Sequence, residues 1–231
     1  MAIVITDNKH YQDIASKIRE CKGTTETMLP REMPDKVEEV YEAGKQAQYD
    51  EFWDVYQDYG KRTSYWGGFT SGWSDDNFKP KYPIIATENS YMFIYTKITN
   101  VNVDLDFTTA ATMANTFAYA YGIKYIKKIM IKADGSTSMT NPFVGANNLI
   151  EIYEIEGLIG KSISMTASSK LSAETAKRII EHLVNYTGTE KEGAYSIKLH
   201  ENVWSALNAT YTPPNEDTWE LYVQNVLGWS T

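Results

Sequence analysis

Two acidic residues, Asp104 and Asp106, come closest in this chain to a catalytic pair. They alternate with Val103, Leu105 and Phe107, a period of two that predicts a strand with both carboxylates on one face. Paired carboxylates can hydrolyse glycosidic bonds or hold calcium. They also form the solvated face of half-buried strands, and we favour that interpretation because no second acidic pair or calcium-type loop accompanies them.

No other residues have the spacing of a reactive or metal-binding site. The histidines, His10, His182 and His200, lie far apart in the sequence. Residues 157–162 (Gly-Leu-Ile-Gly-Lys-Ser) superficially resemble a phosphate-binding loop, but Ile155 occupies the position of its first glycine. We interpret this segment as a turn after a strand, and we expect no catalytic residue, no metal site and no cofactor.

Aromatic side chains are a second group that could bind a ligand, because they make up 13% of the chain and include 17 tyrosines. A tyrosine or tryptophan ring offers a large contact area together with a hydrogen-bonding group. Those in the connector could stack on sugar rings, or they could form a small core that docks the helical part onto the rest. The candidate ligand or partner residues are Tyr65, Trp66, Phe69, Trp73, Trp219, Tyr222 and Trp229.

The net charge of −8 and the pI near 5.0 argue against nucleic acid as a partner, because nucleic acid attracts clustered Lys and Arg. The single cysteine, Cys21, excludes an intramolecular disulfide. Residues 1–11 show no secretory signal, and no apolar run approaches the roughly 18–20 residues of a membrane helix. We expect synthesis in the cytoplasm without membrane insertion, and any action outside the cell would follow lysis or release within a particle.

The clearest internal signal is a repeat in which Met139 takes the place of Met113, an offset of 26. Placing the two segments over one another gives the pattern M-x-N-x-F-x5-[IL]-x2-I-x2-I, and the preceding unit matches in part, with Tyr91 under Phe117. Periods of roughly 20–50 residues indicate a solenoid, whose units bury their apolar faces against one another. We predict an irregular or helical half and then a short strand in each unit. The short strands are predicted to end at residues 103–107, 129–131 and 155.

Residues 1–60 are predicted to be helical, with a short helix at 10–21 and a longer one from about residue 34 to residue 59. The longer helix either packs on its own domain or forms a self-associating stalk, and the pattern favours neither. A strict coiled coil fits less well, because polar residues interrupt the apolar seam. The candidate oligomerisation residues on this helix are Val37, Val40, Tyr41, Phe52, Val55 and Tyr56.

Residues 61–90 form the predicted connector, and residues 91–231 the repeat domain with a C-terminal cap at 171–231. Within the cap, Ser172 is placed to start a helix that ends near Asn185. Further elements are predicted as a strand at 195–199 and helices at 201–207 and about 216–226.

Five motifs follow one another along the chain. They are Tyr11-x2-Ile14-Ala15-x2-Ile18-Arg19, Gly23-Thr24-Thr25-Glu26-Thr27-Met28-x-Pro30-x2-Met33, Tyr49-x2-Phe52-Trp53-x2-Tyr56-x2-Tyr59-Gly60, Trp73-x-Asp75-Asp76-x-Phe78-x-Pro80-x-Tyr82 and Leu171-Ser172-x3-Ala176-x2-Ile179-Ile180-x2-Leu183. Together they resemble tail-associated structural proteins encoded by phages and prophages of gut Firmicutes. In those proteins, helices and a linker precede a leucine-rich-repeat-like domain.

The resemblance implies an α/β repeat fold, with N-terminal helices followed by a short leucine-rich-repeat-like solenoid and a helical C-terminal cap. It implies a non-enzymatic virion protein of the tail tip, baseplate or tail fibre that contributes to host-surface attachment. The implied partners are other tail or baseplate proteins, further copies of the chain, with a trimer favoured, and a host-surface glycan or protein.

Two other functions are weighed against the tail protein. A bacterial leucine-rich-repeat surface adhesin would require an export signal and an anchor, and the sequence shows neither. A glycan-degrading tail protein would use Asp104 and Asp106.

Overall fold

The computed structural model describes residues 74, 76–79, 83–85 and 91–231. The candidate oligomerisation helix and the aromatic residues of the connector lie outside these residues. They are Val37, Val40, Tyr41, Phe52, Val55, Tyr56, Tyr65, Trp66, Phe69 and Trp73.

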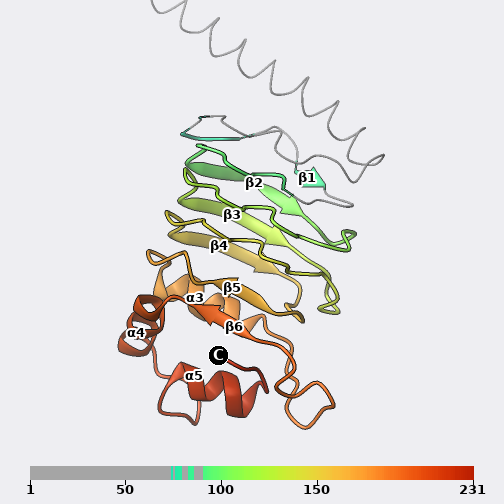
Figure 1. Ribbon diagram of the computed structural model, residues 1–231, viewed down its shortest axis with the longest axis vertical. Helices are drawn as coiled ribbons and strands as arrows, with labels where there is room; N and C mark the ends of the chain where they lie inside the picture. Colours follow the sequence, from blue (N-terminus) through green and yellow to red (C-terminus); the bar gives the residue numbers. More distant parts are fainter. Residues whose placement is uncertain (1–73, 75, 80–82, 86–90) are drawn as a thin grey trace, which may run out of the picture. The chain divides into compact units, whose positions relative to one another are not determined.

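The main sheet is parallel, and its four strands lie side by side in the order in which they occur along the chain (Figure 1). Parallel neighbours need a long return connection, so the chain runs back after each of the central strands before it starts the next. Buried apolar residues alternate with more exposed ones along residues 100–106, whereas the buried isoleucines of the next two strands, at 126 and 129 and at 152 and 155, lie three residues apart. In each strand the buried apolar residues face the core and most of the others face solvent. The strands are β1 (Ile84–Ile85), β2 (Asn100–Asp106), β3 (Tyr125–Met130) and β4 (Glu151–Glu156).

The return segments stack on one another as the strands do. Backbone hydrogen bonds join them, since Phe93 N donates to Thr116 O at 2.7 Å and Phe117 N donates to Pro142 O at 2.8 Å. Inside them, the rings of Phe93, Phe117 and Phe143 stack with centroid distances of 5.3 and 5.1 Å and interplanar angles of 9° and 4°. These segments are irregular turns, one of the two forms that the repeat predicted for this half of each unit.

The register of β3 and β4 follows the repeat found in the sequence. Ile126 lies opposite Ile152, and Ile129 lies opposite Ile155, so both pairs have the offset of the repeat. The offset of 26 therefore describes the spatial relation between these two units.

The earlier unit is shorter, and its predicted alignment was wrong. Phe93, rather than Tyr91, stacks on Phe117, and Leu105 lies opposite Ile129, so the offset here is 24 in place of 26. The register of β2 against β3 shifts within β2, where the shorter unit is accommodated. The alignment of this unit with the next one is therefore set by which apolar residues are buried against each other, and not by a constant number of residues per unit.

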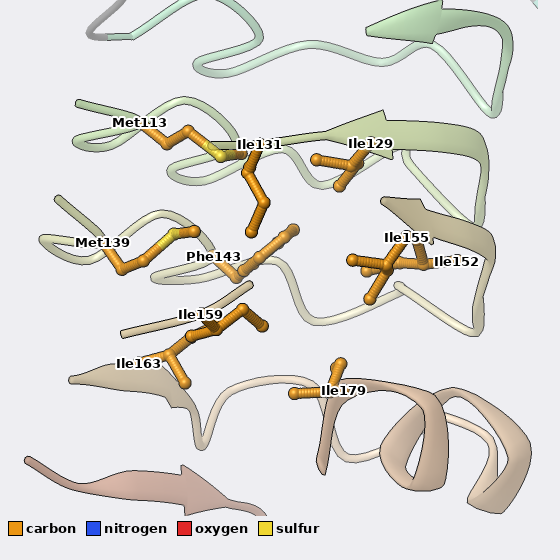
Figure 2. A pocket seen from close by; sticks show the side chains of 10 residues that line it. All are labelled: Met113, Ile129, Ile131, Met139, Phe143, Ile152, Ile155, Ile159, Ile163 and Ile179. Carbon is orange, nitrogen blue, oxygen red and sulfur yellow. The ribbon is translucent and has the colours of Figure 1, made fainter. Parts of the chain in front are cut away.

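The core lies between the sheet and the return segments. Figure 2 shows Met113 pointing toward Ile131, and Met139 pointing toward Phe143, which lies between it and Ile155 of β4. The gap that these side chains enclose is about 20 Å³ and is lined only by apolar residues. A space of this size without polar partners stays dry, so this gap belongs to the core and is not a ligand site.

The C-terminal cap begins with a helix whose first residues were predicted correctly from the sequence. The Ser172 side chain accepts a hydrogen bond from Thr175 N at 3.0 Å and caps α3, but the helix ends at Glu181, earlier than the predicted end. The elements of the cap are α3 (Ala173–Glu181), β6 (Ile197–Leu199), α4 (Glu201–Thr210), α5 (Trp219–Leu221) and the π-helical turn η2 (Tyr222–Val226). Strand β6 pairs in parallel with β5 (Ile163–Met165), which precedes the cap in the chain.

Helix α3 closes the edge of the main sheet at β4. The Thr175 hydroxyl accepts a hydrogen bond from Ile152 N at 3.1 Å and donates to the Glu151 carboxylate at 2.9 Å. The Arg178 guanidinium donates to the Ile152 carbonyl and lies 3.3 Å from the same carboxylate. Side chains of the helix thus bond the backbone groups that a fifth strand would otherwise take.

Candidate functional site

The two tryptophans of the predicted C-terminal aromatic surface are buried. Trp219 and Trp229 are 3% and 2% exposed. Trp219 Nε1 donates to Tyr211 O at 2.9 Å, and Trp229 Nε1 donates to Val184 O at 2.7 Å. Because each indole also satisfies its polar atom inside the protein, these rings belong to the core of the cap rather than to a binding surface.

Tyr222, the third C-terminal candidate, is half-buried. Its ring meets Trp219 edge to face, with centroids 5.4 Å apart and an interplanar angle of 73°. It therefore supports the buried tryptophan and presents only part of its surface to solvent.

The two strand carboxylates lie on the outer face of β2, as the alternation predicted, and each has a separate local partner. Asp104 pairs with Lys127 at 2.8 Å. Asp106 accepts hydrogen bonds from the amide and the hydroxyl of Thr108, at 2.8 and 2.6 Å. Both interactions are those of a solvated strand face and of the turn that ends the strand.

The glycine-containing segment 157–162 packs closely against the preceding unit. Gly157 has a φ of +94°, and a Cβ atom there would lie 2.2 Å from the carbonyl oxygen of Ile131. The close approach of two backbones therefore requires glycine, in agreement with the interpretation of this segment as a turn after a strand.

The two described histidines lie near helix ends. Nδ1 of His200 accepts from Asn202 N at 3.1 Å and caps α4, and Nδ1 of His182 lies 2.8 Å from Arg178 O. Within the described part of the chain, no group of three or more His, Cys, Asp or Glu residues is arranged to hold a metal ion.

Among the described residues, the largest group of exposed aromatic side chains was not predicted from the sequence. Tyr91, Tyr95, Tyr119 and Tyr121, named here the tyrosine ladder, are 42%, 48%, 39% and 48% exposed. The rings of Tyr95 and Tyr119 stack with centroids 5.4 Å apart at 13°, and Tyr121 lies 6.1 Å from Tyr119 at 49°. The return segments thus hold at least three of these rings in fixed relative positions.

The backbone of the tyrosine ladder is strained. The φ angles of Tyr91, Tyr95 and Tyr119 are +70°, +55° and +53°, in the left-handed region that costs a non-glycine residue about 1–2 kcal/mol. In the next unit the residue that matches Tyr119, two positions after the stacked phenylalanine, is Gly145, with a φ of +71°. Glycine suits this position, so Tyr95 and Tyr119 occupy it at an energetic cost that their stacking offsets only in part.

A second aromatic pair, one ring exposed and the other half-buried, lies on the outer face of the sheet. The rings of Tyr125 and Tyr153 stack with centroids 6.1 Å apart at 10°, and Tyr153 is 57% exposed. They border a hollow of about 270 Å³ that Asn100 and Asn102 also line. Aromatic faces beside side-chain amides can contact the apolar face and the hydroxyl groups of a sugar.

The charged residues of the same sheet face form ion pairs between strands. Lys128 of β3 lies 2.8 Å from both Glu154 and Glu156 of β4. The hydrogen bonds of Lys128 to these carboxylates raise the pKa of its ammonium above the ordinary value, and the bond to Glu154 has the larger effect. The charges are therefore paired on this part of the face.

A two-residue relation in the sequence points to part of the ladder. Tyr95 and Tyr119 each follow a core phenylalanine by two positions, and this relation is visible only when the first unit is aligned on the stacked rings of Phe93 and Phe117. An alignment at the constant offset of 26 places Tyr91, and not Phe93, at the position of Phe117, so the relation cannot be seen in it.

Comparisons with protein-family models, curated proteins and solved structures found no match for this chain. Among the described residues, no helix has the length and apolar character needed to cross a bilayer.

Proposed function

We propose that the chain is a non-enzymatic structural protein of a bacteriophage tail, located at the tail tip, baseplate or tail fibre, and that the tyrosine ladder contacts a carbohydrate of the host surface. The observation that carries the attachment role is the stacked, exposed pair Tyr95 and Tyr119, held on strained backbone at a position that is Gly145 in the following unit. Strain of this kind is typical of positions kept for binding.

We also propose that residues 91–231 form a short leucine-rich-repeat-like solenoid with a helical cap. Parallel strands in chain order and the stacked phenylalanines of successive return segments support this assignment. Closure of the β4 edge by α3 also supports it, because a solenoid needs a terminal unit that covers its last repeat. The five sequence motifs supply the link to tail proteins, and virion localisation follows from that link.

The attachment role is tested by binding of the purified full chain to cell-wall polysaccharide from the bacterium whose genome carries the gene. We expect the double variant Tyr95→Ala/Tyr119→Ala to bind at least about tenfold more weakly, because two exposed ring faces are removed. The matched control is Leu158→Ala/Leu221→Ala, which removes two other exposed apolar side chains. Unchanged affinity of a folded tyrosine variant would contradict a role of the ladder in attachment.

Membership of a tail is tested separately. Neighbouring genes for distal-tail, tape-measure or baseplate proteins would support it, and a metabolic operon would contradict it. The proposed homo-oligomer, with a trimer favoured, predicts a mass of three chains in light scattering at high concentration, and a monodisperse monomer would exclude the stalk.

A further inference from the structure

A polar groove lies beside the paired strands β5 and β6. Its volume is about 600 Å³, and it is bordered by residues 138–141 on one side and by β5, β6 and the residues just before them on the other. Hydroxyl groups dominate its lining, and none of its lining residues belongs to the tyrosine ladder. The serine and threonine residues are Ser138, Thr140, Ser162, Ser164 and Ser196.

The groove is positively charged in a chain whose net charge is −8. Lys161 and Lys198 line it, and no Asp or Glu does. Within the described residues, neither lysine forms an ion pair with a carboxylate. Lys198 lies opposite Ser164 in the β5–β6 register, and Ser164 follows Lys161 by three residues. The two lysines are therefore separated by roughly 10 Å along the strand direction.

Lys161 is held in place by an aromatic side chain. Its ammonium donates to the Tyr195 hydroxyl at 3.1 Å and lies 5.0 Å from the centre of the same ring. The Tyr195 ring packs on Tyr186 and Trp229, with centroids 5.3 and 6.0 Å away. The buried Trp229 thus helps to fix Tyr195, and through it the position of the lysine charge.

This arrangement prepares two donors for an incoming anion. Because the Tyr195 oxygen accepts from Lys161, the phenolic proton is free to point toward the groove, and the ammonium keeps further protons to donate. The hydrogen bond raises the pKa of Lys161 and lowers the pKa of Tyr195. Lys161 therefore remains charged at neutral pH.

We infer that the groove binds an anionic carbohydrate, with one carboxylate or phosphate group between Lys161 and Tyr195 and a second at Lys198. Hydroxyl side chains both donate and accept hydrogen bonds, so those between the two lysines suit sugar hydroxyls. Two cationic side chains are too few to hold a nucleic acid against the net negative charge of the chain. The inference rests on the groove alone and does not require the tail assignment.

The test is calorimetric titration of the full chain with four probes at low and at physiological salt. The probes are an oligogalacturonate, an oligosaccharide linked by phosphodiesters, a neutral dextran oligosaccharide and a single-stranded DNA oligonucleotide. We expect at least one anionic carbohydrate to bind more tightly than dextran and DNA, with affinity that falls as salt rises. Lys161→Gln and Lys198→Gln should each weaken that binding about tenfold, as for loss of a charged hydrogen bond.

The matched control is Lys124→Gln/Lys170→Gln, which removes two exposed lysine charges outside the groove. Its affinity should equal that of the unchanged chain, and Tyr195→Phe should weaken binding while the ring packing is kept. The anionic carbohydrate that binds identifies the anion as carboxylate or phosphodiester. The inference is overturned if neither binds, if dextran or DNA binds at least as tightly, or if the control weakens binding as much as the groove variants.

Discussion

Replacing Thr175 by valine should reopen the sheet edge that α3 closes. Valine has nearly the same shape, so the change removes the hydroxyl from a fully buried side chain without leaving a large cavity. Ile152 N then loses its acceptor at 3.1 Å, and the Glu151 carboxylate loses a donor at 2.9 Å but keeps Ser172 and Arg178. An unsatisfied buried amide costs about 1–3 kcal/mol, and a hydrogen bond to a charged group contributes about 1.5–3 kcal/mol.

Because the carboxylate retains two donors, we expect Thr175→Val to lower the free energy of unfolding by about 2–4 kcal/mol. For a domain of this size that corresponds to a fall in Tm of about 4–16 °C. Thr175→Ser keeps the hydroxyl and loses one methyl group, so it should cost only about 1 kcal/mol. Thr212→Val, at an exposed position, is the control for the substitution itself.

The assay is urea denaturation followed by circular dichroism, with hydrogen exchange of the Ile152 amide as a local readout. We expect this amide to exchange faster in Thr175→Val than in Thr175→Ser. If the two variants had equal stability, the hydroxyl would not be what closes the edge, and the assignment of α3 as an edge cap would be refuted.

Two further predictions concern the core and the pH dependence. Phe117 stacks on a ring at each side and Phe143 on one, so Phe117→Leu should cost about 0.5–1.5 kcal/mol more than Phe143→Leu in urea denaturation. Equal costs, or a larger cost for Phe143→Leu, would count against stacking as a stabilising term. The hydrogen bond from the Tyr211 hydroxyl, and then the nearby Arg178, lower the pKa of Glu174 from 4.5. The stability that Glu174 contributes is therefore present above pH 4.5 and lost as the pH falls below it, so Glu174→Gln should destabilise the protein at neutral pH and have less effect in acid. An effect that grew on acidification would contradict this assignment.

The sequence predicted those features that depend on local patterns. The start of α3 follows from the short side chain of Ser172, whose hydroxyl oxygen can accept a hydrogen bond from a backbone amide in the first turn of the helix. The register of β3 and β4 follows from isoleucines that recur at the offset of the repeat, because each must face the interior in its own unit.

Features that depend on long-range packing were not predicted. An indole is equally suited to a core and to a binding surface, and Trp229 is buried by packing on Tyr186 and by a hydrogen bond to Val184, residues far away in the sequence. Three tyrosines of the ladder have left-handed backbone angles, which tyrosine rarely adopts. The residue type therefore gave no sign of this backbone conformation. The groove brings together Lys161 and Tyr195, which are far apart in the chain.

Helix α3 meets the last repeat through apolar packing, where Ile179 lies beside Ile152 and Ile155, and through hydrogen bonds to backbone atoms. Thr175 and Arg178 bond the amide and the carbonyl of Ile152, groups that every strand offers whatever its side chains, and Glu151 is the one side chain that they require. A duplication of the repeat unit that ends in β4 would therefore present the same surface to α3. We therefore expect that a chain lengthened by one such unit would be closed by the same terminal helix.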